Sequence, residues 1–182
     1  MHPVRTLGHG TLTDDELAQL LGEVGIELVV DVRRYPGSRR HPHFGSDEMA
    51  TWLPPRGLAY RWLPSLGGRR TPAAGSPNVG LRNQQFRAYA DHMASEEFAN
   101  GVAELTELAA DRPVAIMCAE SVWWRCHRRL LADHLVLVSE VPVQHLFHDG
   151  RLVEHRPTAE ARRTHDHVVY DVGVDRPLGA DA

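Results

Sequence analysis

The sequence predicts an α/β fold in three layers, a largely parallel sheet of about five strands with helices on both faces. Strand-like apolar runs alternate with segments of helical periodicity, and the strands are continuously apolar, as expected of buried parallel strands. The 182 residues and the 42% hydrophobic content are those of one ordinary soluble domain. We expect a single compact domain over residues 1–156 and a loosely ordered, polar tail over residues 157–182.

The first two strands and the helix between them form a predicted βαβ unit. Residues 4–7 are the first strand and residues 26–33 are the second. The helix between them is expected to begin at Thr13, because Glu16 stands three residues later and completes a capping box. Gly25 supplies the end of the helix.

Shorter elements are expected next along the chain. A loop over residues 34–45 leads to a short helix that Ser46 is expected to cap, and residues 58–63 form a third strand. The stretch 64–83 is rich in glycine and proline and has no periodicity. A loop of this length inside a compact domain is usually functional or disordered. Its two adjacent arginines could close over a ligand as a lid, or the loop could be a plain connector.

The second half of the chain supplies the remaining elements. Helical spacing returns between residues 86 and 108, and the next strand spans residues 114–118. The helix after that strand is expected over residues 124–135. A last strand at 141–147 and a small hairpin arm at 150–155 complete the predicted domain.

The carboxyl ends of consecutive parallel strands meet at one edge of a sheet, where open α/β sheets bind their ligands. In this sequence that edge collects His9, then Asp31 with Arg33, then Cys118 with Glu120. We therefore expect the functional site at this edge, centred on the segment that follows the strand ending at Cys118.

Eight short motifs follow one another along the chain: Thr6-Leu-Gly-His9, Asp31-Val-Arg33, Tyr35-Pro-Gly-Ser-Arg39, Pro42-His-Phe44, Leu66-Gly-Gly68, Tyr89-Ala-Asp-His-Met93, Met117-Cys-Ala-Glu120 and Arg125-Cys-His-Arg-Arg129. Together they resemble the domain of unknown function 488 family. The resemblance implies a compact α/β domain of bacteria and archaea and implies no particular activity. The chain departs from the family pattern at Gly10, where a polar residue is usual.

Two carboxylates at neighbouring strand ends could act as general acid and general base. Glu120 is the stronger candidate and Asp31 would assist it, with His9 positioning a water molecule or a substrate hydroxyl. The alternative is structural: Asp31 would form an ion pair with an arginine and orient the basic loop.

The positions of the arginines indicate an anionic ligand. All 20 basic residues are arginine, which a GC-rich genome would explain by itself, so their number carries little weight. Residues 33–70 nevertheless hold eight arginines against two acids in a chain of net charge −4, which favours one small anion over a nucleic acid. We predict that Arg33, Arg39, Arg125 and Arg128 hold a phosphate; the alternative is that they are solvated surface residues.

The two cysteines allow two further interpretations. Cys118 precedes a predicted helix and could be a thiolate nucleophile, or it could be a small buried apolar residue. A metal could draw on Cys118, Cys126 and His127, with His9 and Glu120 nearby. The spacing matches no standard zinc motif, and neighbours on a helix point about 100° apart. We therefore expect no cofactor.

The leading hypothesis is an enzyme, a hydrolase or group transferase, that acts on a nucleotide or a phosphorylated sugar at the predicted edge. One alternative is a non-catalytic module that binds a nucleotide or a nucleic-acid end. Another is a thiol- or metal-dependent protein that uses Cys118 and its histidine and cysteine neighbours. Without a membrane-spanning run or a signal peptide, we expect a cytoplasmic protein with no membrane partner; the pattern does not predict an oligomeric state.

Overall fold

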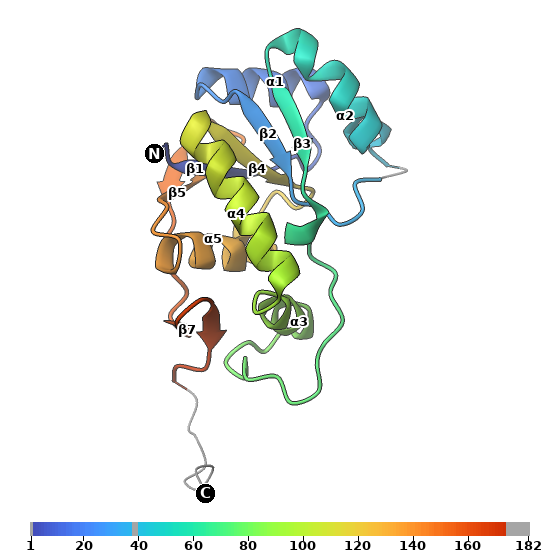
Figure 1. Cartoon of the computed structure of the whole chain (residues 1–182). Coiled ribbons are helices and arrows are strands. Elements are labelled where there is room, and N and C mark those ends of the chain that lie inside the picture. The colour runs from blue at the N-terminus through green and yellow to red at the C-terminus, as the bar shows by residue number, and fades with distance from the viewer. Residues whose placement is uncertain (1, 38–39, 174–182) are drawn as a thin grey trace, which may run out of the picture.

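The computed structural model describes residues 2–37 and 40–173 and has the predicted α/β architecture (Figure 1). In these residues six strands form one sheet in the order β3-β2-β4-β1-β5-β6. Each neighbouring pair from β3 to β5 is parallel, and β6 pairs antiparallel with β5 at the edge. The strands are β1 (Val4–Gly8), β2 (Leu28–Asp31), β3 (Ala59–Trp62), β4 (Val114–Cys118), β5 (Val143–Leu146) and β6 (Leu152–Glu154).

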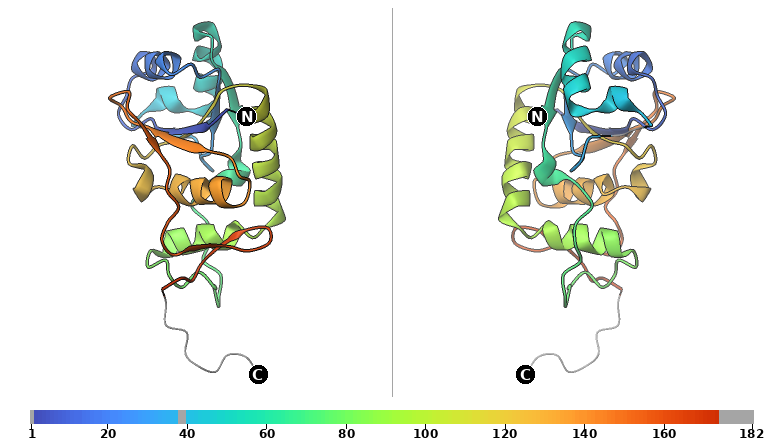
Figure 2. Two further views of the ribbon diagram at one scale, coloured as in Figure 1. Left: turned by 90° about the vertical axis from the view of Figure 1, so that its left-hand side faces the viewer. Right: turned by 90° about the vertical axis from the view of Figure 1, so that its right-hand side faces the viewer.

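Helices pack on both faces of the sheet, as Figure 2 shows from two sides. Successive strand residues point to opposite faces, so Ala115 and Met117 of β4 belong to the core beneath α1 and α2. Ile116 and Cys118 belong to the larger core beneath α4 and α5. In the described part of the chain no helix is long and apolar enough to cross a membrane. The helices are α1 (Asp14–Glu23), α2 (Ser46–Trp52), α3 (Gln84–His92), α4 (Glu96–Asp111) and α5 (Arg128–Leu137).

The predicted starts of the first two helices are correct to within a residue. The capping box of α1 is present: Glu16 N–H donates to Oγ1 of Thr13 at 3.2 Å, and Thr13 N–H donates to Oε2 of Glu16 at 2.8 Å. The cap of α2 is Gly45 rather than Ser46, which is the first residue of the helix itself.

The predicted start of α5 is wrong, because the helix begins at Arg128 instead of near residue 124. The residues Trp123–Arg125 form a separate 3₁₀ turn. The ring of Trp123 stacks on His145 of β5, with centroids 3.8 Å apart and planes inclined by 5°. This contact holds the turn against the sheet. Cys126 then has extended backbone angles, φ −120° and ψ 153°, which interrupt the helical path.

The stretch after residue 157, expected to be a loosely ordered tail, contains an antiparallel hairpin of β7 (Ala161–Arg163) and β8 (Val168–Tyr170). The hairpin lies beside α3 and α5 (Figure 1). Tyr170 is fully buried there, and its hydroxyl donates to the carboxylate of Asp133 at 2.9 Å. Residues 174–182 of the expected tail lie outside the described residues.

Candidate functional site

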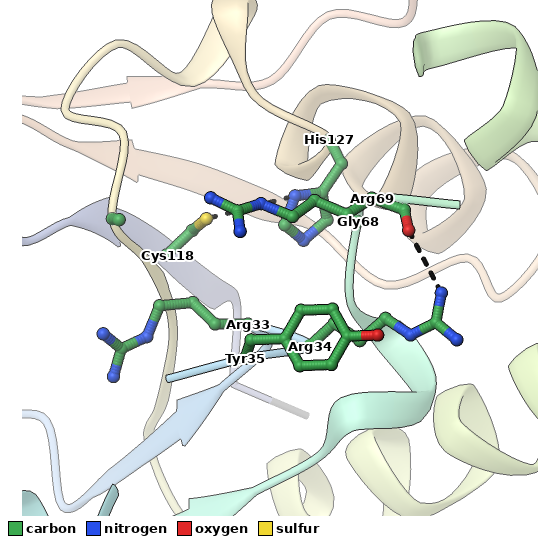
Figure 3. Close-up of a pocket in the computed structure, with 8 residues that line it drawn as sticks. Arg33, Arg34, Tyr35, Gly68, Arg69, Cys118 and His127 are labelled. Atoms are coloured by element: carbon green, nitrogen blue, oxygen red, sulfur yellow. Dashed lines mark hydrogen bonds between the residues drawn. The ribbon is translucent and has the colours of Figure 1, made fainter. Parts of the chain in front are cut away.

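A pocket of about 140 Å³ lies at the carboxyl edge of the sheet (Figure 3). Its floor comes from the end of β4, and its walls come from the segments that follow β2 and β3. His127, the residue before α5, completes the lining of the pocket. The lining residues are Arg33, Arg34, Tyr35, Gly68, Arg69, Cys118, Ala119 and His127.

Two thiols and one imidazole meet at the floor of this pocket, and we call Cys118, Cys126 and His127 the thiol–imidazole cluster. Nδ1 of His127 lies 3.6 Å from Sγ of Cys126 and 4.0 Å from Sγ of Cys118. Nε2 of the same ring lies 3.1 Å from the carbonyl oxygen of Val32. A carbonyl only accepts, so Nε2 carries the ring proton and Nδ1 presents a lone pair to both sulfurs.

Local backbone geometry brings two sequence neighbours to the same point. Cys126 is extended, whereas His127 already has helical angles, φ −58° and ψ −19°. The divergence expected of neighbours within a helix therefore does not apply, because Cys126 lies before α5 begins.

The environment shifts the pKa values of the two thiols in opposite directions. The hydrogen bond to Cys126, followed by burial, raises the pKa of Cys118 well above its usual value. Burial opposes ionisation of Cys126 too, but the hydrogen bond from Cys118 and the positive charge of the Arg128 guanidinium lower the pKa of Cys126 well below its usual value. The surroundings therefore favour the thiolate form at Cys126 and disfavour it at Cys118, where a nucleophile was expected.

Gly68 and Tyr89 confine the imidazole of the cluster. A Cβ atom added at Gly68 would lie 2.9 Å from Nδ1 of His127, so only glycine lets this loop approach the ring. The Tyr89 ring also packs against the imidazole, with its centroid 5.0 Å from that of His127. Its hydroxyl donates to the carbonyl of Leu66 at 2.8 Å. The first part of the long loop is therefore tied to the core at Leu66.

Two arginines that form no ion pair with any carboxylate of the described residues flank the mouth of the pocket. NH1 of Arg34 donates to the carbonyl of Arg69 at 3.0 Å, and its guanidinium lies 5.5 Å from the centroid of the Tyr35 ring. Among the described residues no hydrogen bond or ion pair engages the guanidinium of Arg69. Arg69 also has a positive φ of 59°, a backbone conformation that is strained for a side chain with a Cβ. In the view of Figure 3 the Arg69 side chain overlaps the ring of His127.

Asp31, Arg33 and His9 form a separate buried cluster. Both oxygens of Asp31 are engaged: Nε of Arg33 donates to one at 2.8 Å, and NH2 of Arg33 and the hydroxyl of Tyr60 donate to the other. NH1 of Arg33 lies 3.4 Å from Nε2 of His9, whose ring stacks on Phe44. Burial and the nearby charge of Arg33 lower the pKa of His9 to about 4, so that the ring is neutral. The structural alternative stated for Asp31, an ion pair that orients the basic loop, matches this arrangement.

The other predicted site residues lie in different surroundings. Glu120 is exposed, and its Oε1 accepts from the backbone of Val122 at 3.2 Å. Arg125 is exposed on the 3₁₀ turn. Arg128 is fully buried and donates to the carbonyl of Glu120, so it cannot present its guanidinium to a ligand at the mouth of the pocket. Arg39 lies outside the described residues.

The structure brings Cys118 together with residues that sequence reasoning left aside. Cys126 was considered only as a weak metal ligand, and Arg34 and Tyr35 were not singled out. Position in the sequence could have identified Arg34 and Tyr35, because both residues follow the end of β2, as Arg33 does. Asp31 and Cys118 end neighbouring strands, yet their side chains point to opposite faces of the sheet. Side chains alternate between the two faces of the sheet along β2 and β4, and this alternation predicts that the two side chains are separated.

The fold and the site define an α/β domain with a thiol–imidazole cluster at the carboxyl edge of a parallel sheet. The chain belongs to the family of the domain of unknown function DUF488, whose model matches residues 13–135, more than half of the chain. No curated protein and no solved structure matches this chain.

Proposed function

We propose that the chain is an enzyme that acts by hydrolysis or group transfer on a small phosphorylated substrate, bound at the carboxyl edge of the sheet. One observation carries this proposal: Arg34 and Arg69 flank a pocket whose floor is formed by Cys118 and His127. The described lining residues include no acid, and the guanidinium of Arg33 is neutralised by Asp31. The guanidinium groups of Arg34 and Arg69 therefore give the described lining of the pocket a positive field.

The volume of the pocket limits how much of a ligand it can enclose. A volume of about 140 Å³ is below the roughly 300–1,000 Å³ of pockets that enclose a whole drug-sized ligand. The pocket suits the phosphate group, and the rest of the substrate would lie outside it. Tyr35 stands at the rim with 61% of its surface exposed, so its ring can pack against that outer part.

The groups at the floor can take part in chemistry. Sγ of Cys118 and Nδ1 of His127 are both electron-pair donors, which can hold a proton, attack an electrophile or coordinate a cation. The acid–base role expected of Asp31 and Glu120 receives no support from their positions, because Asp31 is saturated with hydrogen bonds and Glu120 does not line the pocket.

The test measures binding and turnover of nucleotides and sugar phosphates by the wild-type chain, with calorimetry and a phosphate-release assay. Arg34→Gln and Arg69→Gln should each weaken binding at least tenfold, about 1.4 kcal/mol. Arg112→Gln is the matched control, because Arg112 stands before β4 at the opposite edge of the sheet. No binding by any phosphorylated compound would contradict the proposal, and binding without turnover would favour a non-catalytic module instead.

A further inference from the structure

We propose that Cys118, Cys126 and His127 bind a divalent metal ion, preferentially zinc, with one coordination position left open toward the pocket. The inference does not depend on the identity of the substrate. It starts from the arrangement of three donor atoms, Sγ, Sγ and Nδ1, which all lie within 4.8 Å of one another.

The separations of these atoms suit one ion. A tetrahedral zinc ion with Zn–S about 2.3 Å and Zn–N about 2.0 Å holds its sulfur and nitrogen ligands about 3.5 Å apart. The corresponding distances from Nδ1 of His127 are 3.6 Å to Cys126 and 4.0 Å to Cys118. Both distances exceed the tetrahedral separation by about half an ångström or less, so small side-chain movements bring the imidazole and each thiol into coordination range of one ion.

Residues around the cluster orient its ligands as metal sites require. The carbonyl of Val32 holds the imidazole in the tautomer that leaves Nδ1 free for an ion. Nε of Arg128 lies 3.5 Å from Sγ of Cys126 and can stabilise it as a thiolate. Arg128 is itself positioned by Oγ1 of Thr6 at 3.5 Å. A small apolar cysteine in a core would need neither a donor at its sulfur nor an imidazole with a free lone pair.

The donor set selects the type of metal. Two thiolates and one imidazole favour zinc over the hard cations magnesium and calcium, which take oxygen ligands. Three protein ligands with one open position are typical of catalytic rather than structural zinc sites. Cys118 and His127 line the pocket while Cys126 is buried behind them, so the open position faces the space between Arg34 and Arg69. A bound ion would there supply a Lewis acid for water or a phosphate oxygen.

The test uses the full chain, purified without a histidine tag, kept reduced and freed of metal with a chelator. Titration with Co²⁺ should give one ion per chain, with thiolate-to-cobalt charge-transfer absorption and the intense visible bands of tetrahedral cobalt. Zn²⁺ should then displace the Co²⁺. Failure of the reduced wild-type chain to bind either ion stoichiometrically would overturn the proposal.

Variants assign the binding to the cluster. Cys126→Ser and His127→Asn should each weaken Co²⁺ binding at least about 100-fold. His165→Asn, a change at an exposed histidine outside the cluster, should leave it unchanged. Circular dichroism checks that each variant is folded. Equal binding by wild type and a folded Cys126→Ser variant would contradict the assignment.

Thiol reactivity gives a readout on the wild-type chain that needs no variant. The chain has two cysteines, and metal should protect both from alkylation until a chelator is added. Equal alkylation rates with and without Zn²⁺ would count against the site. Arg34→Gln and Arg69→Gln should keep full metal binding while they lose phosphate binding, so failure of the metal site and failure of the proposed substrate remain distinguishable.

Discussion

Nδ1 of His127 lies 3.6 Å from Sγ of Cys126, although the two residues are neighbours in the chain. Side chains of helical neighbours point about 100° apart and would not meet in this way. The contact exists because Cys126 is extended and α5 begins only at Arg128. The start of one helix thus decides whether the cysteines and the histidine form a common site.

Replacement of Gly68 by alanine should disrupt the cluster without unfolding the chain. The new methyl group would stand 2.9 Å from Nδ1 of His127, so the ring or the loop must shift. We expect at least tenfold weaker Co²⁺ binding, measured by the absorption titration. Gly37→Ala is the control, because a Cβ there meets no atom of the described residues within 4 Å. Unchanged binding in Gly68→Ala would contradict the packing described for the ring.

Arg69→Gly should separate stability from ligand binding. Glycine relieves the strain of the positive φ, so the free energy of unfolding should stay the same or rise by up to about 1 kcal/mol. Phosphate affinity should fall at least tenfold, because an uncompensated charge is lost. Denaturant titration measures the free energy of unfolding, and calorimetry measures the phosphate affinity. Glu140→Gly, at a φ of 57°, should show the stability effect without the loss of binding.

Asp133→Asn should destabilise the packing of the C-terminal hairpin. The buried carboxylate accepts from Nε2 of His155 and the backbone of Thr158 on one oxygen and from Tyr170 on the other. An amide cannot accept on both sides, so we expect a loss of about 2–3 kcal/mol. Hydrogen exchange should accelerate first at Val168–Tyr170. Asp166→Asn, at an exposed position, should change neither measurement.

Acidification from pH 6.5 to pH 5 should lower stability through buried histidines, among them His9, His134 and His145. Burial lowers the pKa of His134 to about 4 and that of His145 to about 3 in the folded chain. The unfolded chain takes up protons near pH 6.5 while the folded chain does not, so unfolding is favoured as the pH falls. Each histidine contributes a slope of up to about 1.4 kcal/mol per pH unit.

Denaturant titrations across this pH range measure the slope. His134→Gln should make the slope shallower, because one of the histidines with a lowered pKa is gone. A stability that is flat between pH 6.5 and pH 5 would show that these rings are protonated in the folded chain.

Local patterns predicted the sheet and the edge that holds the pocket. The capping box at Thr13, the buried run before Asp31 and the strand ending at Cys118 depend on residues a few positions apart, and pattern detects such relationships well. These elements place Cys118 at the carboxyl edge of the sheet.

Contacts between distant residues could not be predicted in the same way. Trp123 forms a 3₁₀ turn because it stacks on His145, and Tyr170 is ordered because its hydroxyl reaches Asp133. Arg128 was expected to bind a ligand, but Thr6 and the carbonyl of Glu120 hold it in the core. Nothing in the spacing of these residues reveals such partners.

The most direct test of the site is a crystal structure of the reduced chain soaked with Zn²⁺ and phosphate, with anomalous data at the zinc edge. We expect one anomalous peak bonded to Sγ of Cys118, Sγ of Cys126 and Nδ1 of His127, with phosphate between that peak and the guanidinium groups of Arg34 and Arg69. A cluster without an anomalous peak, or a disulfide between the two cysteines in the reduced crystal, would contradict the assignment.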